Sequence, residues 1–149
     1  MDIKMKFTTN QIHQGEDEVI LNYKEMNEEV SKIIDFFRND NRKIVGWKDK
    51  IQVVVAVSDI LYVESVDGRT YAYTSDDVYK VNYNLVQVEE LLRDISFFRC
   101  SKSMIMNIDK VKNLKSLSSN RIDATMQNGE HIMITRTYAS EFRRILRRE

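Results

Sequence analysis

Short runs of β-branched and aromatic residues follow one another closely from residue 43 onward, and this spacing restricts the fold more than any other feature. Turn residues separate the runs, including Asp67-Gly68 and Asn128-Gly129, which are favoured hairpin dipeptides. The pattern predicts strands over 43–47, 51–55, 60–65, 70–74, 78–81, 97–100, 111–117, 122–127 and 131–134. Because helices do not alternate regularly with these strands, a parallel βαβ sheet is disfavoured. We expect a mainly β protein with a few helices, of the α+β class.

Three segments have the character of helices. Residues 27–37 carry an apolar stripe at helical spacing, and Asn27 can cap them. A second helix is expected over 84–93, where Gln87 stands three residues after the first residue, as in a capping box. Thr137 can cap a final helix that has apolar side chains along one side.

The first 42 residues are expected to form a unit of their own, ahead of a domain that spans 43–149. Segments 3–8 and 18–23 have the composition of short strands, and the first helix follows them. A polar run at 38–43 marks the joint between the two parts. The sequence thus predicts a small strand-helix extension that packs through one apolar face.

Two blocks of sequence place a cation among small hydroxyl residues beside an apolar run. Lys102 lies between Ser101 and Ser103, and Arg136 lies between Thr135 and Thr137. An apolar run can be anchored in a core while its neighbours face outward, so each block can present a cation and hydroxyls to an anionic partner. Arginine suits bidentate contact with guanine, lysine reaches the same acceptors as a point charge, and hydroxyls donate to phosphate oxygens.

A third cation, Arg69, follows the Asp67-Gly68 turn and would add a third loop. The distribution of charge agrees with an anionic partner, although the net charge of the chain is zero. Residues 1–40 hold five basic and nine acidic residues, whereas residues 97–149 hold 11 basic and five acidic residues. A polyanion would experience the basic field around the two blocks. A solvated basic helix at the C-terminus is the alternative explanation for the last four arginines.

Signatures of catalysis and of metal binding are weak in this sequence. The two histidines, His13 and His131, are far apart and lack a cluster of Asp, Glu or Cys at ligand spacing. GxSxG, P-loop and GxGxxG motifs are absent from the sequence. We therefore expect no enzyme activity, no metal, no cofactor and no small-molecule substrate. No apolar run approaches the length of a membrane-spanning helix, and we expect a cytoplasmic protein.

The blocks resemble the signature of the LytTR family of bacterial DNA-binding domains over most of the chain, from about Lys43 onward. The central match is Phe98-Arg99, then Ser101-Lys102-Ser103 and Asn107. The late match is Thr135-Arg136-Thr137-Tyr138, after the Asn128-Gly129 turn. Further similarity lies in Ile60-Leu61-Tyr62-Val63-Glu64-Ser65 and in Asn84-Leu85 followed by Val88-Glu89-Glu90-Leu91-Leu92. The order and spacing of these motifs make the resemblance specific.

The resemblance implies packed antiparallel sheets and loops that enter successive major grooves at direct-repeat sites, without a recognition helix. It implies that Lys102 and Arg136 contact bases, that Arg69 lies in a third contact loop, and that Ser101, Ser103 and Thr135 contact phosphates. Residues 1–42 are too few for a receiver domain, so the chain is similar to the stand-alone regulators of the family. Such regulators imply double-stranded DNA as partner, a homodimer on DNA, and a membrane-protein inhibitor that restrains the regulator. The acidic unit 1–42 could then be a dimerisation surface or a docking site for that inhibitor. Simple capping of the β domain explains this unit at least as well, because an exposed sheet edge needs covering.

Two other hypotheses stay open at this point. The chain could be a protein-interaction module that works through the apolar face of its N-terminal helix, with the basic patch incidental. Alternatively, Cys100 could be a reactive thiol next to Arg99 and Lys102, although a buried and inert cysteine on a strand is the plainer interpretation.

Overall fold

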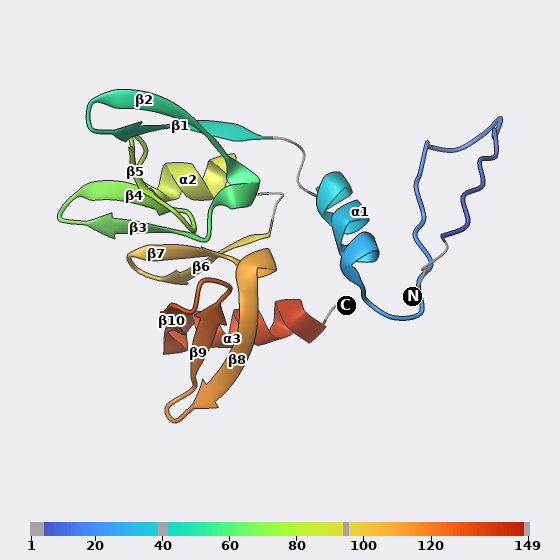
Figure 1. The fold of residues 1–149 in the computed structure, drawn as a ribbon. Helices are drawn as coiled ribbons and strands as arrows, with labels where there is room; N and C mark the ends of the chain where they lie inside the picture. Colours follow the sequence, from blue (N-terminus) through green and yellow to red (C-terminus); the bar gives the residue numbers. More distant parts are fainter. Residues whose placement is uncertain (1–4, 39–41, 94–95, 148–149) are drawn as a thin grey trace.

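The computed structural model describes residues 5–38, 42–93 and 96–147 (Figure 1). Its helices are α1 (Glu28–Arg38), α2 (Leu85–Leu91) and α3 (Arg136–Arg147), with short 3-10 turns at Val57–Asp59 and Ile108–Lys110. Its strands are β1 (Lys43–Lys48), β2 (Ile51–Ala56), β3 (Tyr62–Val66), β4 (Arg69–Tyr73), β5 (Val78–Val81), β6 (Phe97–Ser101), β7 (Met104–Asn107), β8 (Val111–Leu117), β9 (Arg121–Met126) and β10 (His131–Ile134).

The strands form two antiparallel sheets, which confirms the predicted α+β class. The larger sheet has seven strands in the order β2-β1-β5-β4-β3-β7-β6, and the smaller has the order β10-β9-β8. The predicted hairpin at Asp67-Gly68 joins β3 to β4, and both turn residues have positive φ, at 52° and 77°. Two positive φ angles are the requirement of a type I′ turn, which explains why an Asp-Gly dipeptide stands there.

Two apolar cores lie on opposite faces of the larger sheet. One core contains Phe98 and Met106 together with side chains of the smaller sheet and α3, and the Phe98 and Phe142 ring centroids are 5.3 Å apart. The other core packs Leu85 and Val88 of α2 against side chains that include Ile105. The sheet is therefore held from both sides in the region of β3, β6 and β7.

Strand β7 was missing from the sequence prediction. Met106 and Ile105 are adjacent in sequence, and each enters a different core, so both faces of β7 are covered. A strand buried on both faces does not show the alternation of apolar and polar residues that marks a half-exposed strand. The missing alternation is the physical reason why β7 could not be recognised.

The predicted strands at 3–8 and 18–23 were wrong for the described residues. Residues 5–8 and 18–23 have no regular secondary structure, and their side chains are mostly exposed (residues 1–4 lie outside the described range). A strand gains its hydrogen bonds from a neighbouring strand, and neither segment pairs with a strand in the described part of the chain. These segments therefore have a strand-like composition but no neighbouring strand with which to pair.

Two of the three predicted helix caps are confirmed. The Asn27 side chain accepts a hydrogen bond from the Val30 amide at 3.0 Å, and Asn84 and Gln87 form a capping box at α2. The cap expected from Thr137 was wrong, because α3 begins one residue earlier, at Arg136. The Thr135 carbonyl accepts a hydrogen bond from the Ala139 amide at 3.0 Å, so Thr135 is the residue that directly precedes the helix.

The described N-terminal residues lie to one side of the two sheets (Figure 1). Val30 on α1 is buried, and the other buried apolar side chains of the described chain lie at residue 55 and beyond. The division of the chain into 1–42 and 43–149 stays a prediction.

Candidate nucleic-acid interface

The turns that carry the predicted site residues lie side by side along one edge of the β framework. Two backbone contacts join them. The Ser65 amide at the end of β3 donates to the Ser103 carbonyl at 2.8 Å, and the Thr135 amide after β10 donates to the Cys100 carbonyl of β6 at 3.0 Å. The β3–β4 turn, the β6–β7 turn and the start of α3 therefore share one end of the strands, at the left of Figure 1.

The spacing within this row follows from the sheet order. Neighbouring strands lie about 4.8 Å apart, and the turn around Lys102 is separated from the β3–β4 turn by about two strands, roughly 10 Å. The hydrogen bond from Thr135 to Cys100 brings the start of α3 close to the strand that leads into the Lys102 turn. The spacing of the two hairpin turns is smaller than the width of a major groove, which is about 12 Å. One duplex can thus meet neighbouring turns at the same time.

The three predicted cations, Arg69, Lys102 and Arg136, all have exposed side chains. Within the described part of the chain, none of the three side chains forms a hydrogen bond or an ion pair. An exposed cation without a protein partner keeps its full charge for an incoming anion, and no existing ion pair has to be broken first.

Arg99 holds the Lys102 turn in place, a role that the sequence did not reveal. Its Nε donates to the Ser101 carbonyl at 2.8 Å and its Nη2 donates to the Lys102 carbonyl at 2.5 Å. Its Nη1 is paired with Glu89 Oε1 of α2 at 2.5 Å. The side chain of Arg99 is only 20% exposed. A planar guanidinium with donors in a fixed fork can join two carbonyls and a carboxylate, so Arg99 links the turn rigidly to α2.

The three predicted hydroxyl contacts differ in their availability. Ser101 Oγ accepts from the Ser103 amide at 3.3 Å, so its own hydroxyl hydrogen can still be donated. Ser103 has an exposed side chain. Thr135 Oγ1 donates to the Cys100 carbonyl at 3.3 Å, and a hydroxyl has a single hydrogen to donate. A phosphate contact by Thr135 therefore requires this hydroxyl to turn.

The start of α3 adds a favourable field to the same edge. Helix N-termini carry a partial positive charge and free backbone N–H groups, which attract anions. Arg136 is the first residue of α3, and a cation in this position is unfavourable for the isolated helix. An anion bound there would relieve that repulsion, because it interacts with both the guanidinium and the helix end.

The smaller sheet adds a turn at this edge that no sequence motif indicated. Ile134 pairs with Ile122, so the β8–β9 turn lies beside the end of β10. Ser119 and Asn120 in this turn have positive φ, at 62° and 54°. The Asn120 side chain accepts from Arg143 and donates to Ser140 at 3.3 Å, which ties the turn to α3.

Buried polar contacts fix the framework behind these turns. The side chain of Asn107 is buried, donates to the Ile60 carbonyl at 2.9 Å and accepts from the Asp109 amide at 3.1 Å. Tyr62 of the larger sheet donates to Glu130 Oε2, beside the smaller sheet, at 2.5 Å. Burial, together with the bond to Glu130, raises the pKa of Tyr62 above its ordinary value, so the hydroxyl stays protonated as a donor.

The structure also describes the surroundings of Cys100, of His131 and of the possible metal ligands. Burial raises the pKa of the Cys100 thiol to about 12, so the reactive thiolate is scarce near neutral pH. His131 lies in β10 as a strand side chain and contacts Asp123 at 3.0 Å. Among the described residues, no group of three or more His, Cys, Asp or Glu side chains could hold a metal ion.

None of the helices in the described ranges has both the length and the apolar character needed to cross a membrane.

Comparison with known proteins finds similarity to DNA-binding domains. The family model described as the LytTr DNA-binding domain matches residues 50–147. A solved LytTr DNA-binding domain from Bacillus cereus superimposes with a TM-score of 0.67 at 29% identity, covering 70% of this chain and 95% of that domain.

Curated relatives are regulatory proteins. The sensory transduction protein LytT of Bacillus subtilis is 27% identical over 124 residues, which is 83% of this chain and 52% of that protein. LytT of Bacillus cereus is 33% identical over 95 residues (64% of this chain and 39% of that protein). The transcriptional regulatory protein YpdB of Escherichia coli K12 is 26% identical over 109 residues (72% and 44%). The chain thus spans about half or less of the length of these relatives.

Proposed function

Because the chain belongs to the family of LytTr DNA-binding domains, we propose that it is a sequence-specific transcription regulator that reads the major groove of DNA through its turns. The observation that carries this proposal is the row of three exposed cations, Arg69, Lys102 and Arg136, on neighbouring turns of one rigid edge.

The chemistry of the row suits a duplex. Arg136 has the planar fork that forms two hydrogen bonds with the O6 and N7 acceptors of guanine, and Lys102 can reach the same acceptors or a phosphate. Ser101 and Ser103 supply hydroxyl donors for phosphate oxygens beside Lys102. Base contacts give sequence preference, while phosphate contacts give affinity and orientation.

Reading by turns also agrees with the packing of the helices. Phe142 and Ala139 of α3 are fully buried in the core, so this helix is committed to the framework along one side. Only its first turn belongs to the edge described above. We therefore assign base contact to the turns and assign no helix as a reader of the groove.

We further propose that the protein binds direct-repeat sites as a homodimer and that it is cytoplasmic. We also propose that a membrane protein inhibits it. What supports a protein partner is the exposed apolar surface of residues 5–37.

Selection of bound fragments from random double-stranded DNA tests the proposal. The wild-type chain should enrich a defined motif, Arg136→Ala should lose preference at one guanine position, and Lys102→Ala should weaken binding. Arg144→Ala is the matched control, because it removes one exposed charge of α3 that is already paired with Glu141. Enrichment of no motif, or of the same motif by all four proteins, contradicts the proposal.

A protein-interaction module is the second candidate function, and the same exposed apolar surface favours it. The two candidates differ in their response to salt. DNA binding through phosphates weakens steeply as salt rises, because counterions are released. Weak DNA binding that does not respond to salt would favour the interaction module.

A further inference from the structure

Large apolar side chains are exposed along the N-terminal part of the chain. Phe7 is 88% exposed, Phe36 is 71% exposed and Val19 is 69% exposed. The remaining members of this N-terminal patch are Met5, Ile12, Ile20, Tyr23, Met26 and Phe37, each between 42% and 70% exposed. The nine side chains lie within 33 consecutive residues, so exposed large apolar residues are denser here than in the rest of the described sequence, which holds ten.

The N-terminal patch exposes enough apolar surface for an interface. A fully exposed aromatic side chain offers roughly 150–250 Å², and the exposed fractions of the nine side chains together sum to on the order of 1,000 Å². A standard protein interface buries about 800 Å² on each partner. The patch is therefore large enough to form a stable interface with one other protein surface.

A groove runs through the N-terminal patch, beside a protruding ring. Segment 17–23 and the α1 side chains of Ile33, Ile34 and Phe37 line the groove, whose volume is about 550 Å³. The Phe36 ring lies edge-on to the Phe37 ring, with centroids 5.2 Å apart. Phe36 thus stands next to Phe37, which lines the groove, and does not line the groove itself.

A patch that contains both a groove and a protruding ring can bind the same patch of a second copy of the chain. In a two-fold dimer, residue i of one copy contacts residue j of the other, and the reverse contact follows by symmetry. An axis beside α1 would seat Phe36 of each copy in the groove of the other copy. We propose that the N-terminal patch is a homodimer interface, in which Phe36 of each chain occupies the groove between α1 and segment 17–23 of its partner.

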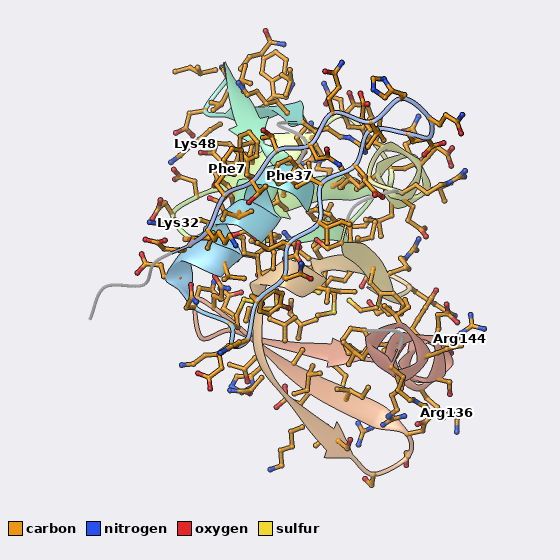
Figure 2. All side chains as sticks on the ribbon, turned by 90° about the vertical axis from the view of Figure 1, so that its right-hand side faces the viewer. Phe7, Lys32, Phe37, Lys48, Arg136 and Arg144 are labelled. Carbon is orange, nitrogen blue, oxygen red and sulfur yellow. The ribbon has the colours of Figure 1, made fainter. Side chains whose placement is uncertain are left out.

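The position of the N-terminal patch leaves the DNA-facing edge free. In Figure 1 the N-terminal residues lie on the right, whereas the β3–β4 and β6–β7 turns lie on the left. Figure 2 looks at the N-terminal side and shows Phe7 and Phe37 well apart from Arg136. A dimer through the patch therefore does not compete with DNA, and its formation does not depend on DNA binding.

The charge around the N-terminal patch distinguishes this dimer from a head-to-tail contact. Residues 5–37 hold seven acidic and three basic residues, and Asp17 and Glu18 line the groove. Two acidic units that meet across a two-fold axis repel each other, so salt should strengthen their association by screening. Contact between an acidic N-terminal unit and the basic α3 of another copy would instead weaken as salt rises.

Sedimentation equilibrium of the full chain, at several salt concentrations, tests the proposal. The wild-type protein is expected at twice the 17.6 kDa of one chain at micromolar concentration, with a dissociation constant that falls as salt rises. Phe36→Asp and Val19→Asp should each raise the dissociation constant at least tenfold. Val86→Asp on α2 is the matched control, because Val86 has the same 69% exposure as Val19 but lies outside the N-terminal patch.

Circular dichroism of the variants establishes that each of them is folded, which is expected because Phe36 and Val19 are exposed. A monomeric wild-type protein throughout the concentration range would overturn the proposal. So would equal dissociation constants for Phe36→Asp and Val86→Asp, or a dimer that salt weakens.

Discussion

Replacement of Arg99 by lysine should weaken DNA binding although it leaves the net charge unchanged. Arg99 donates to the carbonyls of Ser101 and Lys102 and is paired with Glu89. A lysine ammonium is a point charge on a flexible stem and cannot reproduce this fork of donors. The Lys102 turn would lose its link to α2 and would have to be ordered when DNA binds.

The magnitude follows from the two residues that the guanidinium holds. Fixing the backbone of one residue costs about 1–2 kcal/mol, and the bond between Ser101 Oγ and the Ser103 amide retains part of the order. We expect a loss of about 1–2 kcal/mol of binding free energy, which is roughly 5–30-fold in the dissociation constant.

Fluorescence anisotropy with a labelled duplex measures the effect, and α2 offers a matched control. Arg93 is paired with Glu90, one residue along from Glu89, and its side chain is 69% exposed. Arg93→Lys should bind DNA like the wild-type protein. If Arg99→Lys also binds like the wild-type protein, the inference that Arg99 positions the turn is refuted.

Replacement of Glu89, the carboxylate paired with Arg99, is a second test of the link between the Lys102 turn and α2. Removing an acidic charge should strengthen the attraction to DNA if only long-range electrostatics matters. Glu90→Gln should therefore bind slightly more tightly than the wild-type protein. Glu89→Gln releases Arg99 from α2, so we expect no such gain. A gain equal to that of Glu90→Gln would count against the role assigned to Glu89.

Three further changes test the site and its framework. Arg136→Ala should cost about 1–3 kcal/mol on a selected duplex and relax preference at one base pair, measured by competition with mutated duplexes; an unchanged preference would remove Arg136 from the base contacts. Tyr62→Phe should lower the free energy of unfolding in urea by about 1–2 kcal/mol at neutral pH. Because folding raises the pKa of Tyr62, its hydrogen bond stabilises the fold fully below about pH 10, and this stabilisation is lost at higher pH. A difference in unfolding free energy between wild type and Tyr62→Phe that grows above pH 10 would contradict this role. Gly46→Ala should cost about 1–3 kcal/mol of unfolding free energy, because the added Cβ would lie 2.7 Å from Tyr79 Cβ; an unchanged urea midpoint would show that this contact relaxes freely.

The half-exposed strands and the capped helices could be predicted from the sequence, because their signals are local. The strands from β1 to β5 alternate or end at recognisable turns, and the side chains of Asn27 and Asn84 cap the helices that follow them. Strand β7 could not be recognised, since its two covered faces remove the alternation. The segment at 18–23 has strand-like composition, but composition cannot tell whether a partner strand exists.

Only part of the candidate site could be predicted from the sequence. Lys102 and Arg136 could be singled out because each stands among hydroxyl residues beside an apolar run. Their proximity depends on the contact between Thr135 and Cys100, which joins residues 35 positions apart, and local sequence carries no signal for such a contact. The role of Arg99 depends on Glu89 of α2 in the same way. Of these two residues, Arg99 could have been noticed, as a charged residue within an apolar strand.

Amide chemical shifts of the labelled protein, recorded as a selected duplex is added, test most directly whether the row of turns contacts DNA. We expect the largest changes to occur together at 67–69, 101–103 and 135–137, and we expect α1 and segment 5–27 to change little. Changes confined to the N-terminal residues or to the last two turns of α3, with the three turns unaffected, would contradict the proposed contact.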